Sequence, residues 1–255
     1  RGSIVTPLKD RIGSQILTHY PHSLSIAKKI TEQESQISKE KAANIHLPEI
    51  AKDLLEQVGF EARKSEYVDA KSGVSARMSI TAFENLYSTA ERRLLITQDE
   101  KTSIRMTDFL GIIPAINGKI ELVYEGEQEG ANEVSFHLIS MSIKTLFPKY
   151  FPKIEKLEKP NEVGPYDEVL EWFFKDNELF FEDDLNEKEY CKTLDNLPGL
   201  SKIVKKHLPD LDKKDHYFMM EFILWGLESH QKLNKLRRLE GIYFKDSLGS
   251  FINRL

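Results

Sequence analysis

The sequence has little cysteine and no pattern of paired metal ligands. Cys191 is the single cysteine among 255 residues, which excludes an internal disulfide framework and a cysteine-based zinc site. His19 and His22 have a spacing that could bind a metal on a helix, but Pro21 between them would break that helix. The other histidines show no paired ligand spacing. We therefore expect no metal site, and the cysteine content fits a reducing, cytoplasmic compartment.

Two elements of nucleotide hydrolases are also missing from the sequence. No glycine-rich loop ends in lysine and serine or threonine, and no hydrophobic strand ends in a pair of acidic residues that could hold Mg²⁺. Serine-, cysteine- and carboxylate-based hydrolysis have no local signature either. We therefore expect that this segment does not hydrolyse a nucleotide alone.

The sequence has no net positive charge and few long apolar runs. The net charge is −5 and the isoelectric point is about 5.9, so the sequence gives no electrostatic argument for nucleic acid or an anionic membrane as a partner. The most apolar run, Tyr217–Leu227, is roughly half as long as a bilayer requires and contains Glu221. We expect a buried helix there and no membrane span.

What is present is the composition of a folded protein. Hydrophobic residues make up 40% and charged residues 30%, enough for one large or two modest domains. The chain begins with Arg1 and no leader follows, so we expect a fragment of a longer cytoplasmic protein.

Apolar residues recur mostly at three- and four-residue intervals, which predicts a mainly α fold with a few short strands. The predicted helices are a helix capped by Ser23, then 48–66, 77–97, 106–113, 131–147, 169–174, 187–194, 200–207 and a long final helix over 213–239. Predicted extended segments are 15–19, 119–124 and 179–181, with a loop at 125–130.

One arginine follows a short helical turn near the N-terminus. Pro7 opens this turn, Gly13 ends it, and a strand over 15–19 follows, so that Arg11 lies at the edge of a sheet. A lone exposed arginine is most often solvated or salt-bridged.

A second arginine stands in the first turn of the helix 77–97. Arg77 falls outside the apolar stripe, and a cation there is mildly disfavoured by the helix dipole, whereas an anion would be favoured. Arg77 is therefore either an anion-binding residue or a surface arginine stabilised by Glu84 or Asp69.

Both stretches resemble parts of AAA+ ATPases of the magnesium-chelatase I-subunit and MoxR-like branch. Pro-Leu-Lys-Asp-Arg before a strand resembles the arginine-finger segment, and Gly-Val-Ser-Ala-Arg opening a long helix resembles the sensor-2 segment. The sequence Gly-Lys-Ile-Glu-Leu-Val-Tyr-Glu-Gly-Glu also resembles chelatase-type sequences after sensor 2. The resemblance implies that Arg11 reaches the γ-phosphate of ATP in a neighbouring subunit and that Arg77 contacts the γ-phosphate in its own subunit.

The same resemblance implies a division of the chain and a set of partners. Residues 1–45 would be the C-terminal edge of an AAA+ α/β core, 46–150 the helical lid, 151–165 a linker and 166–255 a C-terminal helical region. The full-length protein would bind ATP and Mg²⁺, form a homo-oligomeric ring (hexamer) and remodel a partner, with metal or cofactor insertion as one use. A protein with a von Willebrand A-like domain is the implied second component.

Two alternatives remain open. Glu125, Glu127 and Glu129 could hold a divalent cation, although glutamates between glycines more often form a solvated loop. The whole chain could also be a non-enzymatic helical interaction module. In that case both arginines would be surface groups, and a basic final helix carrying Lys232, Lys235, Arg237 and Arg238 would dock a partner.

Overall fold

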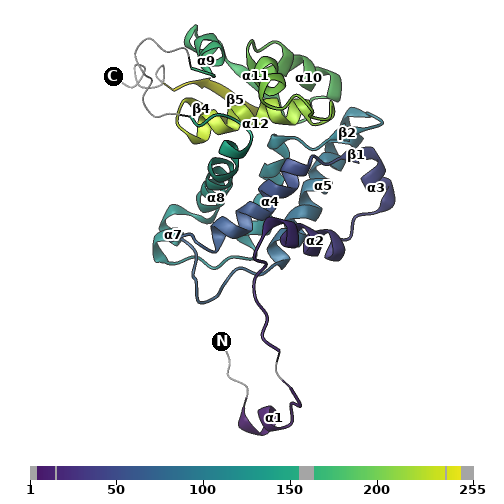
Figure 1. Ribbon diagram of the computed structural model, residues 1–255, viewed down its shortest axis with the longest axis vertical. Coiled ribbons are helices and arrows are strands. Elements are labelled where there is room, and N and C mark those ends of the chain that lie inside the picture. The colour runs from purple at the N-terminus through teal and green to yellow at the C-terminus, as the bar shows by residue number, and fades with distance from the viewer. Residues whose placement is uncertain (1–4, 15, 155–163, 239, 248–255) are drawn as a thin grey trace.

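The computed structural model describes residues 5–14, 16–154, 164–238 and 240–247, and it confirms a mainly helical fold (Figure 1). The α-helices are α1 (Thr6–Asp10), α2 (Leu24–Glu34), α3 (Lys39–Asn44), α4 (Glu49–Ala62), α5 (Arg77–Thr97), α6 (Ile113–Asn117), α7 (Tyr124–Glu129), α8 (Ala131–Leu146), α9 (Asp167–Phe174), α10 (Glu187–Asp195), α11 (Leu200–His207) and α12 (His216–Ser229). The 3₁₀ helices are η1 (Met106–Ile112) and η2 (Phe147–Lys149). The strands are β1 (Ile45–His46), β2 (Thr102–Ser103), β3 (Leu179–Glu182), β4 (Leu233–Arg238) and β5 (Gly241–Asp246).

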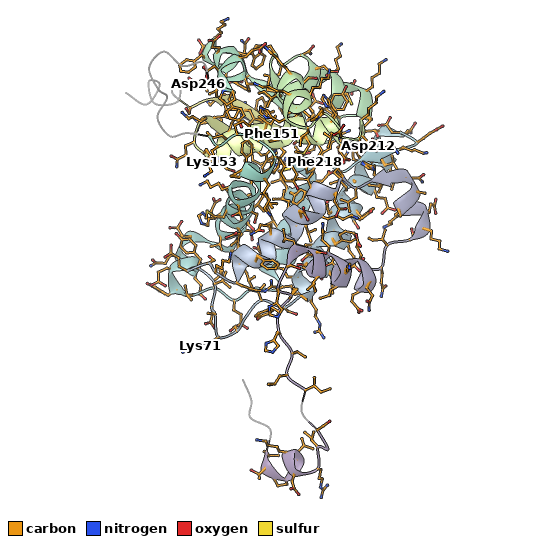
Figure 2. All side chains as sticks on the ribbon, in the orientation of Figure 1. Lys71, Phe151, Lys153, Asp212, Phe218 and Asp246 are labelled. Carbon is orange, nitrogen blue, oxygen red and sulfur yellow. The ribbon has the colours of Figure 1, made fainter. Side chains whose placement is uncertain are left out.

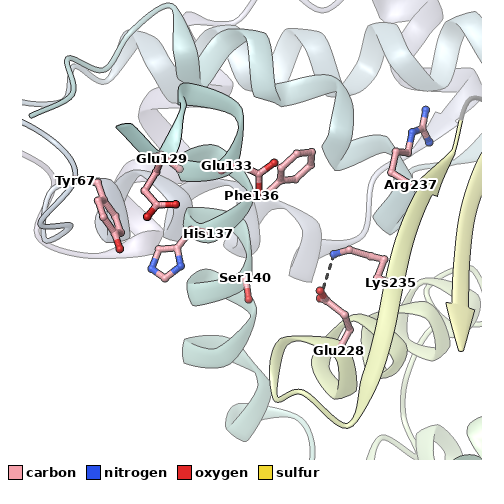
Figure 3. A pocket seen from close by; sticks show the side chains of 10 residues that line it. Tyr67, Glu129, Glu133, Phe136, His137, Ser140, Glu228, Lys235 and Arg237 are labelled. Atoms are coloured by element: carbon pink, nitrogen blue, oxygen red, sulfur yellow. Dashed lines mark hydrogen bonds and ion pairs between the residues drawn. The ribbon is translucent and has the colours of Figure 1, made fainter. Parts of the chain in front are cut away.

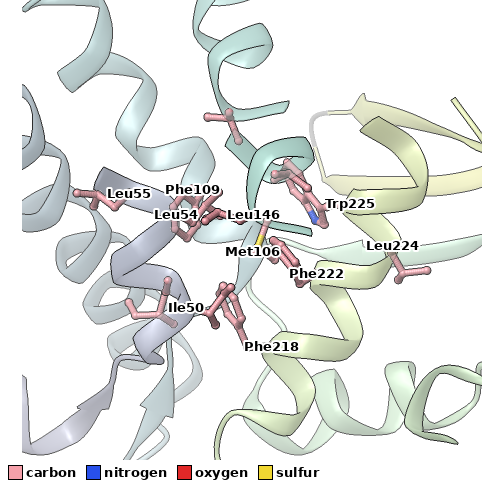
Figure 4. Close-up of a cluster of buried hydrophobic side chains, with 14 of the residues drawn as sticks. Ile50, Leu54, Leu55, Met106, Phe109, Leu146, Phe218, Phe222, Leu224 and Trp225 are labelled. Atoms are coloured by element: carbon pink, nitrogen blue, oxygen red, sulfur yellow. The ribbon is translucent and has the colours of Figure 1, made fainter. Parts of the chain in front are cut away.

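α8 joins the two halves of the hydrophobic core. It packs against α4 on one side and against α12 on the other (Figure 1). Leu146, at the end of α8, lies between Phe109 and Phe222 in the cluster drawn in Figure 4. Phe151 and Phe218, which Figure 2 labels, are also buried in this part of the molecule. The buried apolar side chains therefore form one cluster that extends from Ile45 to Phe244.

A close approach at Gly226 holds α12 against the end of α8. A Cβ atom at this position would lie 2.2 Å from the ring of Phe147. The rings of Phe147 and Phe222 stack at 5.7 Å, so the aromatic contact uses the space that the glycine leaves. The missing side chain at position 226 is thus a packing requirement.

Two small sheets complete the fold. β1 and β2 pair in parallel through Ile45 and Thr102, and β5 lies between β3 and β4 in an antiparallel sheet. Ile242 and Phe244 are two residues apart, so both lie on the buried face of β5, where they pack toward α12 and the core.

The predicted final helix over 213–239 is wrong beyond Ser229. Gln231 has a left-handed backbone (φ 62°), which ends the helix, and the chain returns as the β4–β5 hairpin. The three-residue spacing of Leu233 and Leu236 suggested one helical stripe, but strand geometry separates them, with Leu233 buried and Leu236 exposed. Of the basic residues of this segment, Lys235, Arg237 and Arg238 lie on β4 and Lys232 directly precedes it, so they do not form a helical surface.

Three other local predictions are also wrong. Gln15 lies outside the described residues, and residues 16–19 form no strand, because the described part of the chain offers no strand beside them. The segment predicted as a loop over 125–130 is α7, whose first turn carries Glu125 and Glu127, where the helix dipole favours acidic residues. The predicted strand before it contributes a single bridge, from Leu122 to Val68.

The predicted division near residue 45 and the predicted linker over 151–165 are untested. α3 lies directly before the first boundary, and residues 155–163 of the linker lie outside the described ranges. Ser23 caps α2 as predicted, since its hydroxyl accepts a hydrogen bond from the N–H of Ile26.

Candidate functional site

Arg11 lies at the end of an extended N-terminal arm. Pro7 opens α1 as expected, and the N–H of Arg11 donates to the carbonyl of Leu8 at 3.1 Å, which closes the turn. Figure 1 shows α1 at the far end of the arm, away from the body of the molecule. The Arg11 side chain is exposed and makes no hydrogen bond or ion pair within the described ranges.

The arm carries apolar side chains that are exposed to solvent. Ile16 is 85% exposed, Leu17 75% and Val5 65%, and none of the residues of α1 is buried. Burying one such side chain is worth about 1.5–3 kcal/mol, so several exposed apolar side chains on one arm favour contact with another surface.

The root of the arm is fixed beside the loop that precedes α5. The hydroxyl of Tyr20 accepts a hydrogen bond from the N–H of Val74 at 3.1 Å. The guanidinium of Arg63, at the end of α4, lies 4.5 Å from the centre of the Tyr20 ring. Burial lowers the pKa of Arg63 from its ordinary value. The arm is thus joined to the segment that carries the second predicted site residue.

Arg77 is the first residue of α5, as the sequence predicts. Its N–H donates to the hydroxyl of Ser75 at 3.2 Å, while its side chain is exposed and makes no ion pair with any described residue. Neither Asp69 nor Glu84 forms an ion pair with Arg77 in the described ranges, and the choice between an anion-binding residue and a surface arginine stays a prediction. Glu84 accepts a hydrogen bond from the N–H of Gln36, and Asp69 is used within its own turn.

The turn before α5 is organised by one carboxylate. Asp69 accepts hydrogen bonds from the N–H groups of Lys71 and Ser72, at 3.0 and 3.1 Å, and from the Ser72 hydroxyl at 2.6 Å. The Ser72 hydroxyl, followed by these backbone groups, lowers the pKa of Asp69. Gly73 follows with a left-handed backbone (φ 71°). Lys71, labelled in Figure 2, shows that this turn lies on the side of the body from which the arm extends.

The structure does not bring Arg11 and Arg77 together. α1 lies at the far end of the arm, whereas α5 is part of the body (Figure 1). Neither arginine is close to a described phosphate-binding loop, because the sequence contains none. A single copy of this chain therefore presents two separate exposed arginines.

A buried polar network is the feature that the sequence analysis missed. Glu221, in the apolar run of α12, accepts hydrogen bonds from the N–H groups of Met106 and Thr107, each at 3.0 Å. It also accepts one from the Tyr190 hydroxyl at 2.7 Å. Burial raises the pKa of Glu221 from its ordinary value, and burial also raises that of Tyr190. The position of Glu221 inside the apolar run Tyr217–Leu227 was the sequence signal for this network, because a buried carboxylate needs hydrogen-bond partners.

Next to Glu221 lies a buried ion pair. Arg93 of α5 binds the carboxylate of Asp108, with one Nη2–Oδ2 distance of 3.1 Å, and both side chains are buried. Asp108 also accepts the N–H of Arg105 at 2.8 Å, and the Arg105 guanidinium lies 4.1 Å from the centre of the Tyr190 ring. This network connects α5, η1, α10 and α12, and its position in the core indicates a structural role.

The described ranges contain no group of histidine, cysteine or acidic residues that could hold a metal ion. Glu125, Glu127 and Glu129 lie along α7 and do not converge. No helix in the same ranges is long and apolar enough to cross a membrane.

Comparisons with known protein families, with curated proteins and with solved structures find no significant match to this chain.

Proposed function

We propose that this chain is the C-terminal part of a ring-forming, cytoplasmic AAA+ ATPase similar to magnesium-chelatase I subunits and MoxR-type proteins. In the full-length protein, ATP and Mg²⁺ would bind to a core that precedes this segment. Hydrolysis would drive remodelling of a partner, with a von Willebrand A-like protein as one candidate and a hexamer as the expected ring. Arg11 acts on the ATP of a neighbouring subunit, and Arg77 on the ATP of its own.

The observation that carries this proposal is the state of Arg77. Its side chain is exposed and without an ion pair in the described chain, although Asp69 and Glu84 are its nearest acidic candidates by sequence. It opens a helix of 21 residues directly after an ordered turn. A free guanidinium at a helix N-terminus is a suitable donor set for a phosphate group, because both attract negative charge.

The arm supports the role of Arg11. The exposed Ile16 and Leu17 are the kind of side chains that an α/β core would bury, and Arg11 precedes them on a solvent-exposed turn. The planar guanidinium of an arginine can contact two phosphate oxygens at once. Because a separate subunit supplies this group, hydrolysis depends on assembly of the ring.

The structure weakens the argument for the interaction-module alternative. It relied on a basic face of a final helix, but two of the four basic residues are used in ion pairs on β4. Lys235 binds Glu228 at 3.1 Å, and Arg237 binds Asp183 at 2.6 Å. Docking through a free basic surface is therefore not favoured.

ATP turnover by the full-length protein tests the proposal. Mixed rings containing a rising fraction of Arg11→Ala subunits should lose turnover more steeply than the mutant fraction, because each finger serves a neighbour. Lys9→Ala, on the same turn, is the matched control and should leave turnover unchanged. Turnover that is absent, or that is indifferent to Arg11, would overturn the assignment.

Arg77 needs its own comparison. Arg77→Ala should reduce turnover and the change in lid position that accompanies nucleotide binding. Arg92→Ala changes the same residue type near the other end of α5, where Arg92 pairs with Asp184 at 2.9 Å, and it should have little effect. Equal effects of the two substitutions would show that Arg77 has no special role.

A further inference from the structure

A hollow of about 490 Å³ lies along the outer face of α8. Tyr67 and Glu129 form one side, and Lys235 and Arg237 of β4 form the other (Figure 3). A second hollow of about 320 Å³ adjoins it and shares Tyr67 and His137. The two hollows thus meet at one aromatic pair, whose rings are edge to face at 5.7 Å.

The cations of the β4 wall are neutralised within the protein. Lys235 Nζ lies 3.1 Å from Glu228, and it also stands 3.7 Å from the centre of the Trp225 ring. Both terminal nitrogens of Arg237 donate to Asp183, at 2.6 and 2.7 Å. This wall is fixed, and it has little positive charge left to offer a ligand.

The opposite wall carries uncompensated negative charge. Glu129 and Glu133 are exposed to the hollow and make no hydrogen bond or ion pair with another residue that the structure describes (Figure 3). Five carboxylates and three cations line the two hollows: Glu61, Glu66, Glu129, Glu133 and Glu228, with Lys64, Lys235 and Arg237. A ligand of positive charge is therefore the electrostatic complement.

The aromatic side of the hollow is preformed. The carbonyl of Tyr67 accepts the N–H of Val123 at 3.1 Å, and its own N–H donates to the Ser65 hydroxyl at 3.2 Å. α7 approaches so closely that a Cβ on Gly126 would lie 2.5 Å from the Tyr67 carbonyl oxygen. Figure 3 shows Glu129 beside Tyr67, and Glu133 on the side of α8 that faces β4. A fixed aromatic face beside a free carboxylate is suited to an alkylammonium or guanidinium group, which gains both cation–π and ionic contact.

We propose that these two hollows bind a basic, extended segment of a partner protein. A lysine or arginine side chain of that segment enters beside Tyr67 and pairs with Glu129, and a second basic side chain pairs with Glu133 on the side of α8 that faces β4. A neighbouring side chain occupies the second hollow across the Tyr67–His137 pair. The presence of two adjoining hollows favours a peptide segment over a single small amine. This site is separate from Arg11 and Arg77 and does not depend on ATP hydrolysis.

Peptide binding to the 255-residue chain tests the proposal. The probe is a fluorescein-labelled peptide of alternating arginine and alanine, measured by fluorescence anisotropy, with a glutamate–alanine peptide as the negative probe. Glu129→Gln with Glu133→Gln should weaken binding about tenfold. Glu125→Gln with Glu127→Gln removes the same charge from α7 outside the hollows and should change binding by less than about twofold.

A third variant tests the aromatic contact. Tyr67→Leu should also weaken binding, while the circular dichroism spectrum and thermal midpoint show that the fold is kept. No binding of the basic peptide at millimolar concentration would overturn the proposal, as would equal loss in the two double variants. Free spermine is compared with the basic peptide in the same assay. If spermine binds as tightly as the peptide, and its binding depends equally on Glu129 and Glu133, the hollow is a site for small polyamines and the proposal of a protein partner is overturned.

Discussion

The hydroxyl of Tyr20 and the buried N–H of Val74 are joined by a hydrogen bond of 3.1 Å. This contact joins the end of the N-terminal arm to the loop that leads into α5. The arm is long and exposed, so its position relative to Arg77 depends on this anchor and on the Arg63–Tyr20 contact. The two predicted site residues are separate in space but are connected through one side chain.

Removing the Tyr20 hydroxyl should loosen the arm without unfolding the body. Tyr20→Phe keeps the ring beside Arg63 but leaves the Val74 N–H without its partner, at a cost of about 1 kcal/mol. We expect faster hydrogen exchange at Val74 and faster proteolysis of the arm. Ile16→Ala, on the exposed arm itself, is the control and should leave exchange at Val74 unchanged. Unchanged exchange in Tyr20→Phe would contradict the anchor.

Glu221 should make the free energy of unfolding depend on pH. The direction is opposite to that of a carboxylate whose pKa is lowered in the folded state. Burial raises its folded-state pKa above the unfolded value, so the folded state binds its proton more tightly. The contribution of this group to stability is therefore greatest below the unfolded pKa and is lost as the pH rises through the folded pKa. Glu221→Gln cannot titrate, so the advantage of the wild type over this variant should shrink as the pH rises from about 4.

Urea unfolding of the two proteins at several pH values measures this effect. The other carboxylates are common to both proteins, so the difference between the two free energies of unfolding isolates position 221. A difference that grows with pH would show that the hydrogen bonds from Met106 and Thr107 outweigh burial.

The Arg93–Asp108 pair should be costly to break from one side. Asp108→Asn leaves the buried Arg93 guanidinium without its counter-charge, and we expect a loss of about 3 kcal/mol or more in the free energy of unfolding. Arg93→Met combined with Asp108→Leu removes both charges and should cost less than the sum of the single variants. Additive losses in denaturant titrations would contradict a coupled pair.

Gly226 should tolerate no side chain. Gly226→Ala places a methyl group 2.2 Å from the ring of Phe147, which must move, and we expect a loss of about 1–3 kcal/mol. Gly13→Ala has no neighbouring atom within 4 Å and is the matched control. A thermal midpoint that is unchanged in Gly226→Ala would mean that α12 and η2 can separate without cost.

Local patterns were sufficient for much of the helical fold. α5 begins at Arg77 and α11 ends at His207 as predicted, because apolar spacing and capping residues act within a few turns. The segment after Ser229 could not be predicted in this way, since the choice between a helix and the β4–β5 hairpin depends on β3, which lies about fifty residues earlier in the chain. Glu221 is a similar case, because its partners on η1 and α10 are distant in sequence.

The site shows the same limit. The positions of Arg11 and Arg77 at a turn and a helix start follow from proline, glycine and apolar spacing. The Tyr20–Val74 hydrogen bond and the hollow beside α8 arise only when separate segments meet, so no local pattern encodes them. The AAA+ assignment of the two arginines stays a prediction that the experiments above can decide.

The shared position of α8 determines how the molecule can come apart. Its last turn is covered by α4 on one side and by α12 on the other, and Leu146 and Phe147 are fully buried. Detaching the C-terminal region would expose these side chains to water, at several kcal/mol of lost burial. We therefore expect a single cooperative unfolding transition, and a chain shortened to residue 154 should aggregate through the uncovered end of α8.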